Sequence, residues 1–299
     1  MKIAYAPIYC HPLPEGHRFP MEKYALLPEQ LLREGVVEES DIIAPVPLTR
    51  AEVERVHSPE YIDKLESGSL SRQEERRTGF PLSPKLVERE YTISGGSVMN
   101  TAFAMEDGVS LNIAGGTHHA YRDRGEGFCL FNDIALASDH LLRENPDWKI
   151  LVIDLDVHQG NGTASIFQNE ERVFTFSMHG KNNYPLHKEK SDLDLELEDA
   201  CTDRTYLDLL ERHLDLLFAM VEPQFAFFQS GVDVLATDKL GRLGLSREGC
   251  RRRDAMVFSY CKKHDVPVSV SMGGGYSDKL CDILEAHANT FREAKKAFG

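Results

Sequence analysis

The stretch Lys149-Ile-Leu-Val-Ile-Asp-Leu-Asp-Val-His-Gln-Gly-Asn-Gly162 decides the fold of this chain. Its short apolar run, residues 150–153, is rich in β-branched side chains and is typical of a strand buried on both faces of a parallel sheet. Asp154, Asp156 and His158 follow directly. Residues two apart in an extended chain point to the same side, so these side chains should converge at the carboxyl end of the strand. Open α/β sheets place their ligands there.

Two interpretations of this Asp-x-Asp-x-His pattern are open at this point. Aspartate after an apolar strand often caps the next helix, and the turn Gly160-Asn-Gly162 fits a tight connection from strand to helix. Alternatively, two carboxylates and an imidazole held together would repel and lose hydration unless a cation neutralised them. The second interpretation predicts a metal site.

The composition is ordinary for a folded globular protein, with 41% hydrophobic and 27% charged residues in a chain of 299. We find no internal repeat, low-complexity segment or linker, and therefore predict one domain over residues 1–299. No apolar run approaches about 18 residues and no signal pattern is present, so we expect a cytoplasmic protein. The six cysteines are scattered without a C-x-x-C pair, which predicts reduced thiols and excludes an all-cysteine zinc site.

The formal charge of the chain is −14, which should repel the phosphates of nucleic acids. The same charge favours cationic partners: lysine side chains, basic peptides or polyamines. We expect the acidic run at 192–199 to be an exposed turn and strand. A role for that run in attracting cationic substrates is the secondary interpretation.

Segments with strand and helix patterns alternate along the chain. We predict strands at 2–5, 42–43, 109–113, 150–153, 173–177, 225–229 and 266–270, and helices that include 21–34, 82–105, 133–142, 163–168 and 206–221. This alternation predicts an α/β fold in which helices cover both faces of a mostly parallel sheet.

Residues suited to chemistry follow four of these strands. His118 and His119 come after the strand at 109–113, Asp233 after 225–229, and Tyr276 after 266–270. Because the carboxyl ends of parallel strands meet at one edge of a sheet, we expect these residues to join the Asp-x-Asp-x-His group in one site. Two carboxylates and one imidazole leave a coordination position of Zn²⁺ open, which is typical of catalytic rather than structural zinc.

Five motifs resemble those of the zinc-dependent histone deacetylase superfamily, which also contains acetylpolyamine amidohydrolases. They are Gly115-Gly-Thr-His-His-Ala120, Gly127-Phe-Cys-Leu-Phe-Asn-Asp133, Asp154-Leu-Asp-Val-His-Gln-Gly-Asn-Gly162, Ser230-Gly-Val-Asp233 and Gly273-Gly-Gly-Tyr276. The motifs fall in the family's order, and with the loop at 17–21 they span nearly the whole chain. Residues 238–246 and the short C-terminus are most similar to class IV enzymes and bacterial relatives. The resemblance implies the arginase-like fold, a three-layer α/β/α sandwich.

The resemblance also implies a metal centre and a catalytic group. Asp156, His158 and Asp233 would bind Zn²⁺, although the sequence does not distinguish Zn²⁺ from Fe²⁺ as the native metal. His118 and His119 would be the tandem catalytic histidines, of which His119 acts as the general acid and base.

Further roles carry over around these histidines. Tyr276 would donate a hydrogen bond to the developing oxyanion, and Asp154 would orient His118. Asn161 stands where many class I members carry aspartate, so His119 would have a neutral partner and a less elevated pKa. Asp154 and Ser177 would hold a structural K⁺ ion.

The resemblance implies a set of substrate-binding residues as well. Gly127 and Phe128 would line the acyl-lysine tunnel, although packing in the core is the alternative for Phe128. Gly274 would contact the substrate. Arg18 would belong to the internal region that releases acetate, although a solvated surface charge is the alternative for an arginine in a loop. No phenylalanine matches the opposite tunnel wall near residues 183–184, which leaves the shape of that wall open.

The leading functional hypothesis is a zinc-dependent amidohydrolase that removes acetyl or longer acyl groups from lysine in proteins or peptides. We expect longer acyl groups to be accepted at least as well as acetyl, because of the missing tunnel phenylalanine and the class IV resemblance. An acetylpolyamine deacetylase is the alternative within the same class. A catalytically silent module that binds acyl-lysine is the alternative from another class. We expect no direct binding to nucleic acid or membrane.

Overall fold

The computed structural model describes residues 1–299 and contains one sheet of eight strands, in the order β2-β1-β3-β8-β7-β4-β5-β6. All neighbouring strands are parallel. The prediction of a parallel sheet is therefore confirmed. The strands are β1 Lys2–Ala4, β2 Ile42–Ile43, β3 Val109–Asn112, β4 Ile150–Asp154, β5 Val173–Gly180, β6 Leu193–Leu197, β7 Phe225–Gln229 and β8 Val268–Ser271.

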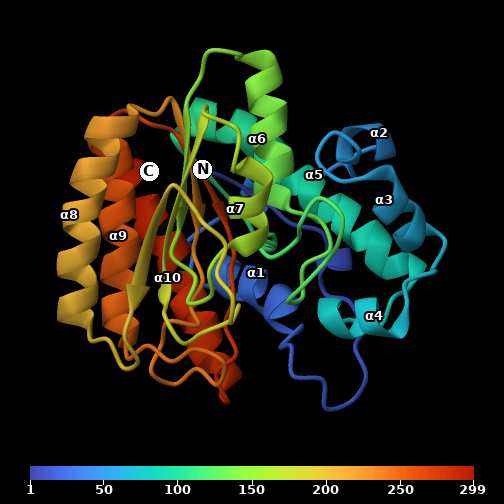
Figure 1. Ribbon diagram of the computed structural model, residues 1–299. Coiled ribbons are helices and arrows are strands. Elements are labelled where there is room, and N and C mark those ends of the chain that lie inside the picture. The colour runs from blue at the N-terminus through green and yellow to red at the C-terminus, as the bar shows by residue number, and fades with distance from the viewer.

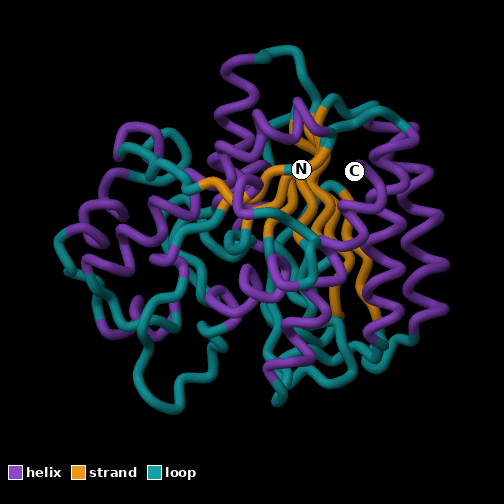
Figure 2. Tube along the Cα trace, turned by 180° about the vertical axis from the view of Figure 1, so that it is seen from behind, coloured by secondary structure: helices purple, strands orange, loops and turns teal.

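Helices cover both faces of this sheet (Figures 1 and 2), as the alternation of segments predicts. Helices α8, α9 and α10 pack side by side, with α1 against α10, while α5 packs on β1, β3 and β8 and contacts α6. The result is the expected three-layer α/β/α sandwich. The helices are α1 Lys23–Arg33, α2 Arg50–Val53, α3 Pro59–Glu66, α4 Arg72–Thr78, α5 Pro84–Asp107, α6 Asp133–Glu144, α7 Asn161–Phe167, α8 Asp203–Val221, α9 Arg247–Lys263 and α10 Leu280–Phe298, with short 3₁₀ turns η1 Pro7–Tyr9 and η2 Glu39–Asp41.

The central strands are buried along their whole length. Every residue of β4 and β7 is buried, and the register pairs Asp154 with Gln229 at their carboxyl ends. The apolar side chains of these strands belong to one contiguous cluster of 73 buried residues. The polar residues Asp154 and Gln229 thus lie at the carboxyl ends of these strands, where the loops begin.

Two glycines inside α5 allow the close packing that their position predicts. A Cβ atom at Gly95 would collide with the carbonyl oxygen of Val46, and one at Gly96 would lie 2.5 Å from the hydroxyl of Tyr9. Glycine inside a helix costs about 1 kcal/mol relative to alanine. Here the close packing of the segments around Tyr9 and Val46 against the helix offsets this cost.

Some elements differ from the prediction. The polar segment at 68–79, for which an exposed loop and a surface helix were both open, contains α4, which a capping box at Ser71 begins. The last strand starts at Val268, two residues later than expected. The acidic run contains the edge strand β6, as expected. Helix α10 was not predicted from the sequence. No helix is both long enough and apolar enough to cross a membrane.

Candidate metal centre and active site

The predicted site residues come together at the carboxyl ends of four adjacent strands. These strands are β3, β8, β7 and β4, and their order in the sheet is not their order in the chain. The loop after β3 carries His118 and His119, the loop after β4 carries Asp156 and His158, and β7 leads to Asp233. The parallel arrangement therefore gathers residues that are far apart in the sequence.

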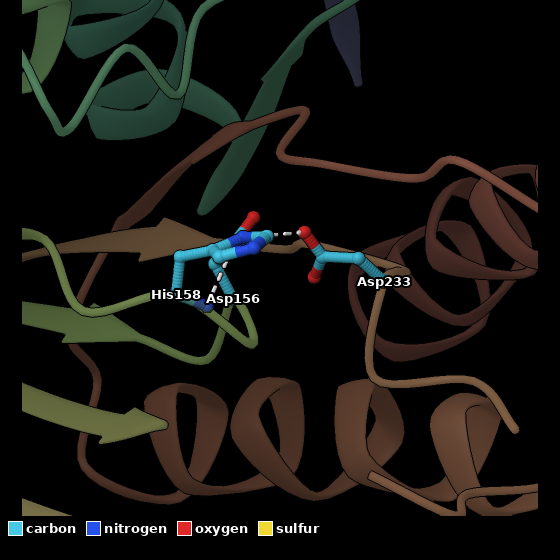
Figure 3. Close-up of side chains that lie close together, drawn as sticks. All are labelled: Asp156, His158 and Asp233. Atoms are coloured by element: carbon cyan, nitrogen blue, oxygen red, sulfur yellow. Dashed lines mark hydrogen bonds and ion pairs between the residues drawn. The ribbon is translucent and has the colours of Figure 1, made fainter. Parts of the chain in front are cut away.

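Asp156, His158 and Asp233 form a buried three-residue cluster (Figure 3). Each offers one ligand atom, and these atoms lie within 4.8 Å of one another. Nδ1 of His158 lies 3.1 Å from Oδ1 of Asp156 and 3.2 Å from Oδ2 of Asp233. Oδ2 of Asp233 is buried without a hydrogen-bond partner. Two oxygens and one nitrogen, one of them an orphaned carboxylate oxygen, suit a divalent cation such as Zn²⁺.

Backbone amides hold the carboxylates of this cluster in place. Oδ1 of Asp233 accepts a hydrogen bond from the amide of Val157 at 2.9 Å. Oδ2 of Asp156 accepts one from Gly274 at 2.8 Å. A Cβ atom at Gly274 would collide with Asp233, so the glycine permits the β8 loop to approach both carboxylates.

The charges in the cluster are strongly coupled. Burial lowers the pKa of His158, but the nearby carboxylates of Asp156 and Asp233 outweigh it and raise that pKa to about 10. Burial, and then the charge of Asp156, raise the pKa of Asp233 to about 7. The two buried carboxylates repel each other when both are ionised. A divalent cation between them would supply the positive charge that stabilises both.

The tandem histidines have different partners. Nδ1 of His118 lies 2.7 Å from Oδ2 of Asp154, and Nδ1 of His119 lies 2.6 Å from Oδ1 of Asn161. Both Asp154 and the amide oxygen of Asn161 accept hydrogen bonds, so both histidines carry a proton on Nδ1. This assignment leaves Nε2 of His119 free to accept a proton. Asn161 is itself oriented by donating to the hydroxyl of Tyr121 at 3.0 Å.

These partners give the two imidazoles opposite charge states. Burial lowers the pKa of His118, but the charges of Asp154 and Asp156 outweigh it and raise that pKa to about 9. Burial, with the charges of His118 and His158, holds the pKa of His119 well below its ordinary value. Asp154 therefore favours the imidazolium form of His118, while burial favours the neutral form of His119.

Tyr276 faces the cluster with a protonated hydroxyl. Its ring centroid lies 6.5 Å from that of His158 and 5.9 Å from that of Phe128. Burial, and then the charges of Asp233 and Asp156, raise the pKa of Tyr276 well above its ordinary value. The hydroxyl can therefore donate a hydrogen bond over the whole neutral range.

Aromatic side chains line the approach to the metal centre. Phe128 has a left-handed backbone with φ of 68° and contacts the ring of Phe19 at a centroid distance of 5.1 Å. Backbone strain of this kind in a residue that is not glycine often marks a functional position. On the other side, the ring of Tyr184 lies edge to face with His119 at 5.0 Å. The wall whose shape the sequence left open is thus aromatic.

A small inner cavity of about 40 Å³ lies beside the cluster. Its walls include the tandem histidines and Tyr276, and also Lys23 and Arg89, which the sequence did not single out. Lys23 is fully buried and donates to the carbonyl oxygen of Gly273 at 3.2 Å. Burial lowers the pKa of Lys23 to about 8. The volume suits a few water molecules. The acceptance of acyl groups longer than acetyl stays a prediction.

Arg18 lies elsewhere than the resemblance implies. Its side chain is exposed and lines an outer cavity of about 440 Å³, not the inner one. The guanidinium carbon of Arg18 lies 4.9 Å from the ring centroid of Phe128. Lys23 and Arg89 are the cations of the inner cavity. A long loop sets the position of Arg18, so its sequence neighbours alone could not reveal it.

Asp154 and Ser177, the implied potassium residues, are Cα partners at the ends of β4 and β5. The hydroxyl of Ser177 shares a hydrogen bond of 2.9 Å with Nδ1 of His179. Asp154 also contacts His118, so the pair lies next to the tandem histidines, and neither residue lines the outer cavity.

Residues 17–291 match the family model described as "Histone deacetylase domain". The chain belongs to the histone deacetylase family. An uncharacterized protein of Picosynechococcus sp. is 41% identical over 296 residues, covering 99% of both chains. Histone deacetylase 2 of Arabidopsis thaliana is 28% identical, covering 90% of this chain and 72% of that protein.

Histone deacetylase homologues also share the fold. The crystal structure of such a homologue complexed with SAHA superposes with a TM-score of 0.84, at 24% identity, covering 99% of this chain and 84% of that one. A homologue from Aquifex aeolicus gives a TM-score of 0.82 at 23% identity, with the same coverage. Membership of the histone deacetylase family supports a hydrolase with deacetylase activity. The arginase-like fold read from the sequence is confirmed.

Proposed function

We propose that this protein is a zinc-dependent amidohydrolase that removes acetyl or longer acyl groups from the ε-amine of lysine in proteins or peptides. We assign it to the class IV and bacterial branch of the family and to the cytoplasm. The observation that carries the proposal is the buried cluster of Asp156, His158 and Asp233 beside a neutral His119.

The residues of the chain divide the chemistry among them. When bound, Zn²⁺ supplies Lewis acidity, which polarises the substrate's amide carbonyl and makes water a stronger acid. Nε2 of His119 takes the proton of the attacking water and delivers a proton to the leaving amine. His118, held as an imidazolium by Asp154, supplies positive charge close to the reacting atoms.

Tyr276 stabilises the transition state in this scheme. Its hydroxyl donates to the carbonyl oxygen, which gains negative charge as the water attacks. Because that hydrogen bond strengthens during the reaction, it contributes more to kcat than to substrate binding. Phe128 and Tyr184 hold the methylene stem of the lysine between aromatic faces. Gly127 and Gly274 leave room for the substrate, and Asp154 and Ser177 share a structural K⁺ ion.

Two other functions remain as alternatives for the same site. An acetylpolyamine deacetylase would use the same metal centre on a small cationic amide. A silent acyl-lysine module would need neither a neutral base nor a protonated tyrosine beside the cluster, so the paired charge states of His118 and His119 speak against it.

Activity on three kinds of sample distinguishes these functions. Purified protein loaded with Zn²⁺ is incubated with an acetyl-lysine peptide in one sample and with acetylputrescine in a second. A third sample contains the peptide together with a chelator. We expect release of acetate from the peptide and its loss on chelation. Faster turnover of acetylputrescine would favour the polyamine alternative. Binding of the peptide without any acetate release would support the silent module.

A further inference from the structure

Four arginines surround the mouth of the active site. Arg18 comes from the loop before α1, Arg76 and Arg77 from the last turn of α4, and Arg242 from the loop before α9. All four are exposed side chains that line the outer cavity of about 440 Å³. No aspartate or glutamate belongs to that lining.

Little negative charge offsets these arginines. Arg18 and Arg76 have no carboxylate within 4 Å; the guanidinium of Arg18 lies instead over the ring of Phe128. The carboxylate nearest to Arg77 is Glu126, at 4.0 Å. That carboxylate already pairs with Arg124 at 2.9 Å.

The remaining arginine is only loosely paired. Arg242 lies 3.4 Å from Asp199, with both side chains exposed to solvent. Exposed ion pairs of this kind contribute little and leave the arginine free to exchange partners. The mouth is therefore a local basic surface on a chain whose net charge is −14.

The outer cavity opens directly onto the catalytic residues. His119, Gly127, Phe128, His158 and Tyr276 line both the inner and the outer cavity. An acyl-lysine that reaches the metal centre must therefore leave the residues on either side of it among the four arginines. Their charge acts on the substrate's flanks rather than on the scissile bond.

We propose that this mouth selects acyl-lysines in an acidic sequence context, with aspartate or glutamate next to the modified lysine. The inference rests on the proposed function and deepens it. A guanidinium recognises a carboxylate through paired N–H groups, and several such cations attract an anionic peptide over a distance. The same charges repel lysine-rich tails and polyamines, although the overall charge of the chain favours cationic partners.

A peptide panel tests this selection. Three peptides carry one acetyl-lysine flanked on both sides by glutamate, serine or lysine, and kcat/KM is measured for each at low salt. The wild-type enzyme should prefer the glutamate peptide to the lysine peptide by about tenfold or more. At about 1 M salt, where the screening length falls to about 3 Å, this preference should largely disappear.

Two triple variants separate the mouth from overall charge. Arg18→Gln/Arg76→Gln/Arg77→Gln removes three cations from the mouth. The control, Arg72→Gln/Arg204→Gln/Arg212→Gln, removes three exposed arginines outside the cavity lining and changes the net charge equally. The mouth variant should bring the ratio of glutamate to lysine peptide close to one, and the control should keep the wild-type ratio.

Hydrolysis of the serine peptide distinguishes failure of the inference from failure of the proposed function. If the wild-type enzyme hydrolyses it but does not prefer glutamate flanks, or if the control loses the preference as fully as the mouth variant, the inference is wrong while the proposed function stands. If no peptide is hydrolysed, the proposed function fails. The mouth is then tested by fluorescence anisotropy of labelled peptides, and tighter binding of the lysine peptide would overturn the inference.

Discussion

Two adjacent histidines in this protein differ in charge because their Nδ1 partners differ. The rings of His118 and His119 lie 4.1 Å apart, yet one faces the carboxylate of Asp154 and the other the neutral amide of Asn161. A carboxylate stabilises an imidazolium, whereas an amide orients the ring without adding charge. Asn161 therefore adds no negative charge that would protonate the proposed base, and burial with the charges of His118 and His158 keeps the pKa of His119 low.

Asn161→Asp tests this role through the pH profile. The base works only when neutral, so activity falls as pH drops through the pKa of His119. An aspartate at 161 raises that pKa, and the acid limb of kcat/KM should move to higher pH by about one unit or more. The measurement is kcat/KM from pH 5 to 9, with metal content determined in parallel. An acid limb that stays in place or moves to lower pH would assign the base elsewhere.

Tyr276→Phe removes the proposed oxyanion donor and keeps the packing of its ring against Phe128. We expect a loss of about 2.7–4 kcal/mol of transition-state stabilisation, mostly in kcat, as is usual when one such donor is deleted. Steady-state kinetics on the acetyl-lysine peptide gives the number. Turnover within about threefold of the wild type would mean that the tyrosine only packs the loop.

At the scale of elements, strand ends and glycine-rich loops build the site together. The loop after β8 lies against the metal ligands because Gly274 has no side chain, and Lys23 of α1 holds the same loop from beneath. Such close approach explains why three glycines precede Tyr276.

Gly274→Ala should therefore weaken metal binding without unfolding the protein. The added methyl group would collide with Asp233 and lie 3.0 Å from Oδ2 of Asp156. We expect at least about tenfold weaker Zn²⁺ affinity, in the range seen when the surroundings of metal ligands are disturbed. Gln73→Ala is the control, since Gln73 is an exposed residue of α4 outside both cavities. Equal Zn²⁺ affinity in the two variants would show that the loop after β8 shifts to accommodate the methyl group without disturbing the metal ligands.

The elements differ in how far the sequence predicts them. Strand β7 was predicted with its observed bounds, and β4 to within one residue, because uninterrupted apolar runs mark fully buried strands. The residues of the cluster follow such strands within a few positions, so their meeting point was predictable too. Lys23, Arg76, Arg77 and Arg242 come from segments whose placement depends on tertiary packing. No local sequence pattern predicts that they lie at the site.

For the molecule as a whole, net charge was a poor guide to the site. The chain carries −14, which predicts attraction of cations, but the mouth is lined by arginines. Loops from distant parts of the chain bring these arginines together. The net charge of a chain therefore does not reveal a local surface of the opposite sign.

Loss of the metal should destabilise the whole fold. The cluster joins the loops after β4 and β7, and without a cation its buried carboxylates repel each other. A ligand present at 100 times its Kd adds about 2.7 kcal/mol to the free energy of unfolding. We therefore expect chelation to lower Tm by several degrees, measured by scanning calorimetry with and without excess Zn²⁺. An unchanged Tm would mean that no metal binds to the folded state.

The central claim is that Asp156, His158 and Asp233 hold a catalytic Zn²⁺, and Asp233→Ala tests it most directly. Metal content and acetyl-lysine turnover are measured on the same preparation, with circular dichroism to verify folding. Asp278→Ala is the control, because Asp278 is 77% exposed and pairs only with Lys239. The account predicts loss of both zinc and turnover in Asp233→Ala and neither loss in the control. A folded Asp233→Ala protein that retains stoichiometric zinc, or that turns over at the wild-type rate, would contradict it.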